Sequence, residues 1–211
     1  MTRRQGSNLA VALAAVVLAV PAMAGESDVS ALLGAKVLTE DRFDDAGLDS
    51  GFQYGIRSTV DFGWPVALAF DLLFASDGAT ESFSGGFPLS IKTDIDTREF
   101  HFGVRRYFLR DKQARPYVGG GISLAQMKVV QIESGDFGPG TEYSNTVVND
   151  EDTSVGYWLS GGFGYFIKNF VIGADVRWSN ASSKVASTGV DGTVKLDSGG
   201  LQYAAFVGYS W

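Results

Sequence analysis

The residue of this chain best suited to acid–base catalysis near neutral pH is His101, its only histidine. Glu99 stands two residues before it, in the segment Arg98-Glu-Phe-His-Phe-Gly-Val-Arg105. A lipid-modifying site would need a serine and an acid beside the histidine, and this segment contains no serine. We therefore interpret His101 as a buried histidine bonded to a neighbouring carboxylate, and we expect a protein without enzymatic activity.

Nine polar side chains, His101 among them, fall on one face of the extended segments predicted below. They are Lys36, Arg57, Asp71, Glu99, His101, Arg105, Asp175, Arg177 and Gln202. Apart from the histidine and the glutamine, they comprise four cations and three anions. Charges in a narrow interior are costly unless they are paired and hydrogen-bonded, so this near balance predicts an interior closed by ion pairs. The alternative is that the same charges line a thin water-filled path, a narrow channel for small or apolar solutes.

Residues that could bind a metal ion gather in one acidic segment. Asp41, Asp44, Asp45 and Asp49 offer the hard oxygen ligands that calcium and magnesium prefer. Their spacing matches no defined calcium-binding loop, so we interpret the segment as a solvated loop and expect no metal site and no cofactor. The absence of cysteine excludes a disulfide and a thiolate metal site. The net charge of −7 argues against nucleic-acid binding, which requires a basic surface.

The elements that position these residues are eight segments in which every second residue is apolar or aromatic. A period of two is typical of a strand with one apolar face. Each apolar band has roughly the nine to eleven residues that a tilted membrane strand requires. The predicted strands lie at 29–37, 52–62, 66–74, 100–108, 118–124, 155–165, 170–178 and 201–211.

The bulky members of this pattern are predicted to point outwards, into lipid. An inward set of Phe, Tyr, Trp, Leu and Ile from eight strands would be too large for an eight-stranded interior, which argues against a soluble barrel or sandwich. The opposite face carries small residues and the nine polar ones, and its glycines leave room for side chains such as Trp158. The sequence thus predicts an all-β fold, an eight-stranded antiparallel up-and-down transmembrane β-barrel, without a wide diffusion pore.

The connections between these strands alternate between long polar segments and short turns. The long ones are 39–50, 75–94, 133–153 and 180–198, and the short ones are 62–65, 109–116 and 167–170. This alternation is typical of an outer-membrane barrel with long extracellular loops and short periplasmic turns. The long loops carry net charges of −4, −2, −6 and 0 in chain order, −12 in total, whereas the turns carry +3. We therefore expect an acidic surface outside the cell.

Residues 1–24 have the composition of a secretory signal peptide. Arg3 and Arg4 precede an apolar run at 9–20, and Ala22-Met-Ala24 offers a small-residue cleavage site. That run is too short for a membrane-spanning helix, which needs about twenty residues. We predict export by the general secretory route, with a barrel domain at 25–211.

Three stretches of the chain carry a resemblance. Phe102-Gly-Val-Arg-Arg-Tyr-Phe108 enters a short turn, and Arg115-Pro-Tyr-Val-Gly-Gly-Gly-Ile-Ser123 opens the next strand. Tyr209-Ser-Trp211 is an aromatic end in which tryptophan replaces the usual phenylalanine. Together they resemble the small eight-stranded outer-membrane β-barrel proteins of Gram-negative bacteria, the OmpA-like and OmpX-like barrel group.

This resemblance implies an integral protein of the outer membrane that contacts outer-membrane lipid and lipopolysaccharide. It implies folding by periplasmic chaperones and the barrel-assembly machinery, with Tyr209 and Trp211 as the assembly signal. Proteins of this group serve in envelope integrity or as surface antigens, adhesins or resistance factors, and some are porin-like. The peptidoglycan-binding domain of larger OmpA-like members follows the barrel and is not expected here, since Trp211 is the last residue.

Overall fold

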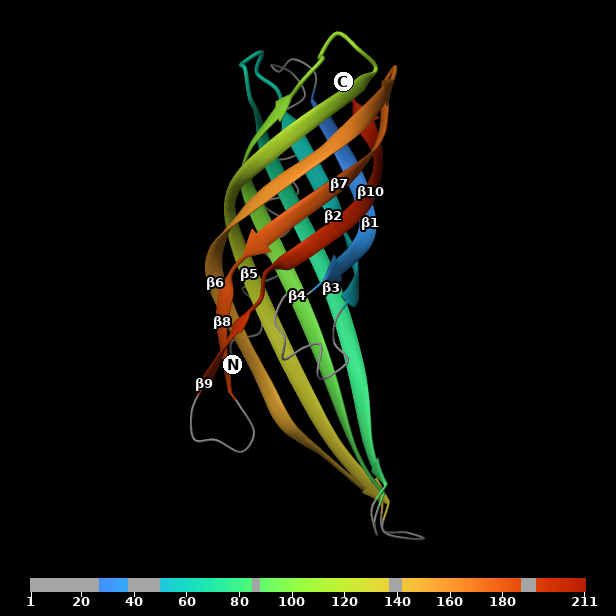
Figure 1. The fold of residues 1–211 in the computed structure, drawn as a ribbon, viewed down its shortest axis with the longest axis vertical. Coiled ribbons are helices and arrows are strands. Elements are labelled where there is room, and N and C mark those ends of the chain that lie inside the picture. The colour runs from blue at the N-terminus through green and yellow to red at the C-terminus, as the bar shows by residue number, and fades with distance from the viewer. Residues whose placement is uncertain (1–26, 38–49, 85–87, 137–141, 187–192) are drawn as a thin grey trace.

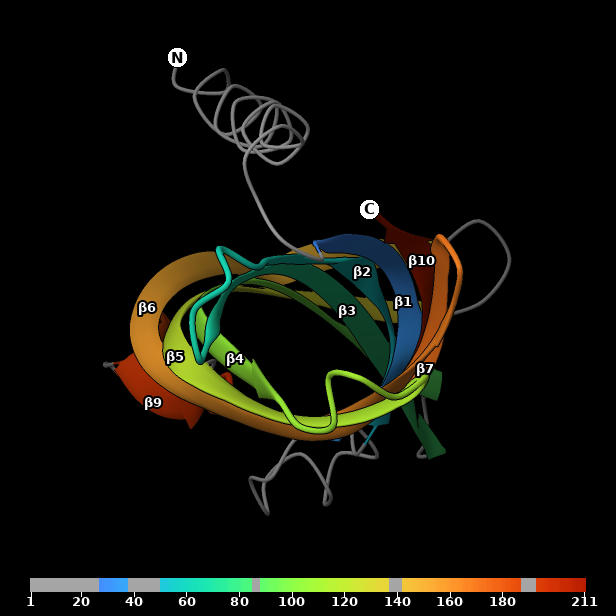
Figure 2. The same ribbon diagram turned by 90° about the horizontal axis from the view of Figure 1, so that it is seen from above.

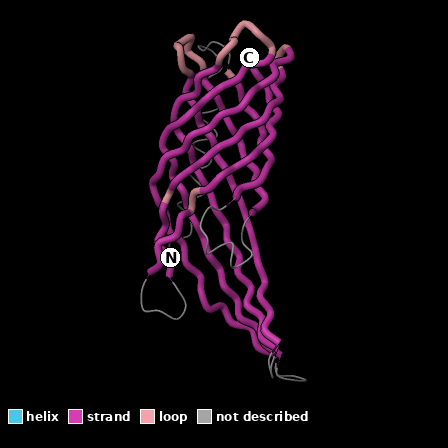
Figure 3. The backbone as a smooth tube through the Cα atoms, in the orientation of Figure 1, coloured by secondary structure: helices cyan, strands magenta, loops and turns pink. Residues whose placement is uncertain are grey.

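The computed structural model describes residues 27–37, 50–84, 88–136, 142–186 and 193–211, and almost all of them are in strands (Figure 3). The strands are β1 Asp28–Val37, β2 Ser50–Val60, β3 Ala67–Ser84, β4 Pro88–Tyr107, β5 Ala114–Asp136, β6 Glu142–Ile167, β7 Phe170–Asn180, β8 Ser182–Ala186, β9 Thr193–Asp197 and β10 Gly200–Ser210. Across these described residues, no helix has the length and apolar character needed to cross a membrane.

Eight of the strands form one closed antiparallel barrel, in the order β1-β10-β7-β6-β5-β4-β3-β2 (Figures 1 and 2). Pairing of β1 with β10, from Asp28↔Ser210 to Val37↔Leu201, closes the ring. Ser27 and Trp211 extend this seam by exchanging two backbone hydrogen bonds of 3.0 Å. The predicted eight-stranded up-and-down barrel is therefore confirmed. A closed ring leaves no strand edge unpaired at this level, which a barrel in lipid requires.

The barrel has its bulky apolar side chains on the outside. Leu33, Ile56, Leu159 and Val155 are between 53% and 71% exposed, as the alternation predicts. The interior apolar cluster is small and consists of Leu32, Leu73, Tyr117, Val171 and Phe206. Val60 was predicted to face lipid, but it is buried, so the alternation is interrupted near the end of β2.

Short turns join the strands at the end where Asp28 and Ser210 lie. Gly63, Leu109 and Lys168 adopt positive φ angles of 76°, 54° and 54° in these turns. Glycine adopts this left-handed conformation without strain, while the other two positions are held by their tight connections. The predicted short connections are confirmed, and this is the end that the sequence predicts to face the periplasm.

At the opposite end the predicted long loops are largely wrong. β3 and β4 continue through 75–94 except for residues 85–87, and β5 and β6 fill 133–153 except for 137–141. Within 180–198, β8 and β9 pair as a separate hairpin. The four long strands project beyond the barrel and converge (Figure 1). The outward face of this projecting sheet carries exposed charged residues such as Asp96 and Glu151, so its strands lack the apolar alternation that marks a lipid-facing strand.

Two predictions fall on residues outside the described part of the chain. These are the signal peptide at 1–24 and the acidic loop at 39–50, of which only Ser50 is described, as the first residue of β2.

Candidate functional site

The nine polar residues predicted for the interior all lie inside the barrel and are at most 3% exposed. Six of the barrel strands contribute them. Lys36 comes from β1, Arg57 from β2, Asp71 from β3, Glu99, His101 and Arg105 from β4, Asp175 and Arg177 from β7, and Gln202 from β10. The structure brings them into one connected network of polar contacts.

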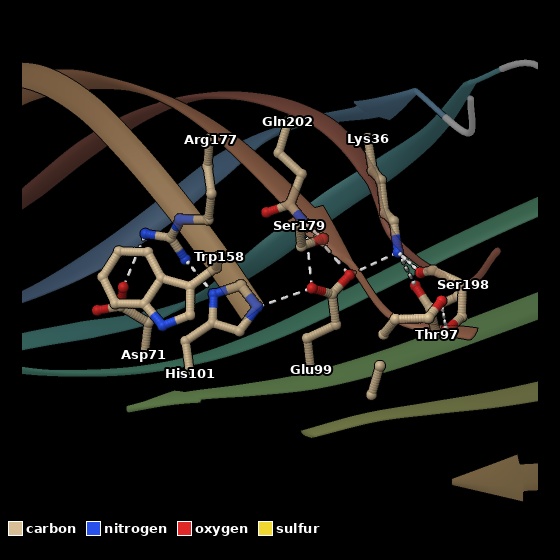
Figure 4. A network of polar contacts seen from close by, with 12 residues as sticks. Lys36, Asp71, Thr97, Glu99, His101, Trp158, Arg177, Ser179, Ser198 and Gln202 are labelled. Carbon is tan, nitrogen blue, oxygen red and sulfur yellow. Dashed lines mark hydrogen bonds and ion pairs between the residues drawn. The ribbon is translucent and has the colours of Figure 1, made fainter. Parts of the chain in front are cut away.

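Glu99 is the centre of the extracellular part of this network (Figure 4). Lys36 Nζ lies 2.5 Å from Glu99 Oε1 and donates a second bond of 2.6 Å to the backbone oxygen of Ser198. Gln202 Nε2 donates to both carboxylate oxygens, at 3.1 and 3.2 Å. Gln53, which the sequence analysis missed, donates to Gln202 Oε1 at 3.0 Å. The carboxylate therefore has protein donors in place of water.

His101 joins this part of the network to the middle of the barrel. Its Nε2 lies 2.8 Å from Glu99 Oε2, and its Nδ1 lies 3.0 Å from Arg177 Nη1. A guanidinium can only donate, so Nδ1 accepts and Nε2 carries the proton given to Glu99. The partners thus fix one neutral tautomer of the imidazole. The Trp158 ring stacks on it, with centroids 5.5 Å apart and an interplanar angle of 7°.

Asp71 is the shared acceptor of two arginines in the middle of the barrel. Arg177 Nη2 lies 2.7 Å and Arg105 Nη2 lies 3.0 Å from Asp71 Oδ2. Arg105 also donates to Thr59 Oγ1 at 2.7 Å, and Arg177 Nε lies 3.4 Å from Asp175 Oδ1. One carboxylate shared by two arginines, each with a further acceptor, is the arrangement that makes buried charge tolerable.

Arg57 is the central residue of the periplasmic part of the network. It donates to Tyr117 Oη at 2.8 Å and to Tyr107 Oη at 3.1 Å, and its guanidinium lies 3.9 Å from the centre of the Phe206 ring. Tyr117 donates to Asp175 at 2.5 Å. The sequence analysis missed both tyrosines, although each occupies an inward position of its strand.

Asp28 completes the charges of the interior. It is buried, and its carboxylate accepts a hydrogen bond of 3.2 Å from Tyr107. With Asp28, four interior anions balance the four cations, and the neutral His101 adds no charge. The predicted first strand begins at residue 29, one residue too late, and so excludes Asp28. Its alternation with Ser30 and Leu32 could have revealed it.

Glycines of β5 allow close packing around Trp158. A Cβ atom on Gly119 would lie 3.2 Å from the Trp158 ring. On Gly121 it would collide with the backbone oxygen of Phe102 on the adjacent strand. Trp158 is fully buried and its Nε1 donates to that same oxygen at 3.4 Å, so the indole fills the lumen beside His101.

The site lacks the geometry of a nucleophile activated by His101. Both ring nitrogens of the histidine are occupied by Glu99 and Arg177. Ser123 lies opposite His101 on β5, a serine that was not considered because it is on the next strand. Its side chain is fully buried, and its Oγ has no hydrogen-bond partner among the residues described. A substrate could not reach it without displacing the network.

The predicted assembly signal lies at the periplasmic end of the barrel. Tyr209 is half exposed and stacks on Trp211, with ring centroids 6.2 Å apart. Asn169, in the turn between β6 and β7, accepts from the Ser210 amide at 2.8 Å and donates to its carbonyl at 3.1 Å. This aromatic end is thereby held to a neighbouring turn, a contact that the sequence analysis missed.

The described residues offer few other candidate sites. In the part of the chain that the structure describes, no group of three or more His, Cys, Asp and Glu side chains could hold a metal ion. A shallow pocket lies at the extracellular rim and is lined by Lys36, Gly51, Ala75, Ser76, Asp77, Ile95 and Thr97.

A closed antiparallel ring with apolar residues outside and paired charges inside defines a transmembrane β-barrel. The family model of the outer membrane protein beta-barrel domain matches residues 10–177, and the chain belongs to this family. It is an integral protein of the outer membrane of Gram-negative bacteria.

Several solved structures are similar to this chain. The outer membrane protein OprG from Pseudomonas aeruginosa is 15% identical, with 90% of this chain and 97% of that chain covered and a TM-score of 0.54. Neisserial surface protein A is 14% identical over 88% and 96% of the two chains, with a TM-score of 0.48. Ail, the attachment invasion locus protein of Yersinia pestis, is 15% identical over 90% and 100%, with a TM-score of 0.48. No curated protein matches the chain in sequence.

Proposed function

We propose that this protein is a non-enzymatic outer-membrane barrel with a largely closed interior, which serves envelope integrity or surface interaction. The observation that supports this proposal most directly is the connected network of buried polar side chains, which runs through the barrel from Lys36 to Asp28. Eight charges of balanced sign, with Trp158 packed between them, occupy the space that a solute would need. An eight-stranded barrel is just wide enough for its own side chains.

The projecting sheet supports the surface role. We call this part the extension and define it as residues 77–84, 88–96, 125–136 and 142–154. By sequence it contains ten carboxylates and two lysines, a net charge of −8. β2 pairs with β3 only as far as Ser76, so in the described chain the β3 edge beyond that residue has no partner strand. Such an edge can pair with an extended segment of another protein, and the acidic surface disfavours polyanions.

The same proposal includes the route by which the protein reaches the outer membrane. Residues 1–24 act as the signal peptide for the general secretory route, and periplasmic chaperones deliver the chain to the barrel-assembly machinery. Tyr209 and Trp211 form the signal that this machinery reads. In the membrane, outer-membrane lipid and lipopolysaccharide surround the barrel.

Electrical recording from the purified barrel in planar lipid bilayers tests the closed interior. We expect no steady unitary conductance from the unaltered protein. Trp158→Ala should introduce leak currents, because it removes the largest fully buried side chain. A variant that keeps its folded electrophoretic mobility provides the control for misfolding. Regular steps from the unaltered protein would refute closure.

A narrow channel is the second candidate, and one observation favours it. Several buried polar atoms have no hydrogen-bond partner in the described residues, namely Arg57 Nε, Arg105 Nε, Ser123 Oγ and Ser160 Oγ. A single file of water molecules could form hydrogen bonds with these atoms. If the unaltered barrel conducts, and Arg57→Gln or Arg105→Gln abolishes the steps, the channel replaces the closed barrel as the conclusion.

Exposure of the extension on the cell surface and enzymatic activity have separate tests. The chain has no cysteine, so a single introduced cysteine is the only labelling site. On intact cells, a membrane-impermeant maleimide should label Ser144→Cys in the extension and leave Gln113→Cys at the periplasmic turn unlabelled. The composition of lipid A should not change when the gene is deleted, and a change would favour a lipid-modifying enzyme.

A further inference from the structure

Strand β4 carries an arginine at each end of its lipid-facing row. The row reads Arg98, Phe100, Phe102, Val104 and Arg106, and both arginines are exposed. Neither of them has a carboxylate partner in the described chain. A cation facing hydrocarbon is costly except near the level of the headgroups. The two arginines therefore mark the two boundaries of the membrane.

The surroundings of Arg106, at the periplasmic boundary, are cationic. Arg106 and the exposed Lys112 and Lys168 form what we call the periplasmic collar. Of the described carboxylates at this end, Asp28 is buried inside the barrel and Asp61 pairs with Arg110 at 2.9 Å. Among the described residues, Asp111 is the one exposed carboxylate at this end. The collar thus presents an excess of positive charge over the exposed carboxylates of the described residues.

Arg98, at the extracellular boundary, has different neighbours. The next outward positions on β4, β5 and β6 hold Asp96, Lys128 and Glu151, which lie side by side in the sheet. Carboxylates flank the lysine on both sides, so the local charge is mixed. An anion would meet repulsion here that it would not meet at Arg106.

Aromatic side chains place the collar at the depth of lipid headgroups. Phe62, Trp64, Phe170 and Tyr209 are exposed at the same end of the barrel. The guanidinium of Arg106 lies 5.5 Å from the centre of the exposed Phe108 ring. Aromatic girdles of this kind lie at the membrane–water interface, where the phosphate groups of the periplasmic leaflet are also found.

From this placement we propose that the periplasmic collar binds the phosphate groups of anionic phospholipids, with Arg106 holding one phosphodiester on the lipid-facing side of β4. A guanidinium donates two parallel hydrogen bonds to two phosphate oxygens. The lysines add attraction over a longer range, and the phospholipid's acyl chains lie along Phe102 and Val104. The inference depends on the position of the barrel in the membrane and not on whether its interior is closed.

Native mass spectrometry of the full-length barrel, released from detergent with added phosphatidylglycerol, tests the proposal. We expect Arg106→Gln to weaken phosphatidylglycerol binding about fivefold, the effect of one cation near an anionic lipid surface. Arg106→Lys should keep most of the binding. Lys112→Gln with Lys168→Gln should produce a loss of similar or larger size.

Arg98→Gln is the matched control, since it removes an unpaired lipid-facing arginine from the same strand. It should change phosphatidylglycerol binding less than twofold, and the zwitterionic phosphatidylcholine should bind weakly to every variant. Equal losses from Arg98→Gln and Arg106→Gln would overturn the inference, as would equal binding of the two lipids. A loss confined to the lysine variant would overturn the role of Arg106. Unchanged mobility on unheated gels shows that each variant is folded.

Discussion

Two ion pairs of similar length lie in different surroundings. In the lumen, Arg177 and Asp71 approach to 2.7 Å, with side chains 1% and 0% exposed. On the extension, Lys92 and Asp94 approach to 2.9 Å, with side chains 53% and 38% exposed. The inner pair is shielded from bulk solvent, so a group that loses its partner there stays buried, whereas the outer pair is in contact with solvent. The distance between two charges therefore does not determine what the pair contributes to stability.

The same contrast separates the two regions as wholes. In the lumen, almost every charge has its partner on another strand, so the network ties together strands that are not neighbours, such as β1 with β4 and β4 with β7. In the extension, the backbone hydrogen bonds between adjacent strands carry the structure. We infer that the lumen requires a complete network, while the extension tolerates substitution at almost any exposed side chain.

The largest effect is expected from Asp71→Ala. The substitution leaves Arg105 and Arg177 buried without their shared carboxylate. Removing one partner of a buried pair lowers the free energy of unfolding by about 3–5 kcal/mol. Urea unfolding of the barrel in phospholipid vesicles, followed by tryptophan fluorescence, measures it. Asp71→Asn keeps the side-chain volume and should lose less, and a loss below about 1 kcal/mol for the alanine variant would contradict the network.

The second effect concerns the lipid-facing surface. Leu159 is 57% exposed on β6, in the apolar band, so Leu159→Arg should lower the free energy of unfolding in vesicles by about 2–4 kcal/mol. Thr153 lies on the same face of the same strand, six residues away and within the extension. Thr153→Arg should change it by less than about 1 kcal/mol. Equal losses at the two positions would place the membrane boundary elsewhere.

The third effect tests close packing within the barrel wall. On Gly121 an added Cβ would collide with the backbone oxygen of Phe102, whereas on Gly161 its nearest contact would be 3.8 Å away. Gly121→Ala should therefore lower the free energy of unfolding by about 1–3 kcal/mol, and Gly161→Ala should leave it nearly unchanged. The same urea series compares the two variants. Similar values for both would mean that the strands can separate enough to accept a methyl group.

The sequence predicted the lipid-embedded region well because lipid leaves a physical signature there. Bulky outward residues alternate with mostly small or polar inward ones along the strands, and this pattern set the register that put Lys36, Glu99 and Arg177 inside. Asp28, Tyr107 and Tyr117 lie on the same inward face. They were missed because a residue at a strand end, or an aromatic residue inside a barrel, does not stand out by type.

The extension could not be predicted in the same way. Above the membrane the outward face of β3 to β6 meets water, so charged residues such as Asp94 and Glu151 occupy outward positions where phenylalanine or leucine stands lower in the barrel. A polar strand and a polar loop have similar compositions, and only the pairing register distinguishes them. The pairing of side chains within the network could not be predicted either, because alternation gives the face on which a residue lies but not which side chains meet across the lumen.

The smallest effect is expected from Lys92→Ala, which removes the outer ion pair. Both side chains remain hydrated after the change, so the free energy of unfolding should fall by no more than about 0.5 kcal/mol. Salt should abolish even this difference, because screening at 1 M reduces the range of charge interactions to about 3 Å. The urea series with and without salt measures both quantities. A loss approaching that of Asp71→Ala would mean that the extension contributes to the barrel's stability through its side chains, and the two regions would then share one network.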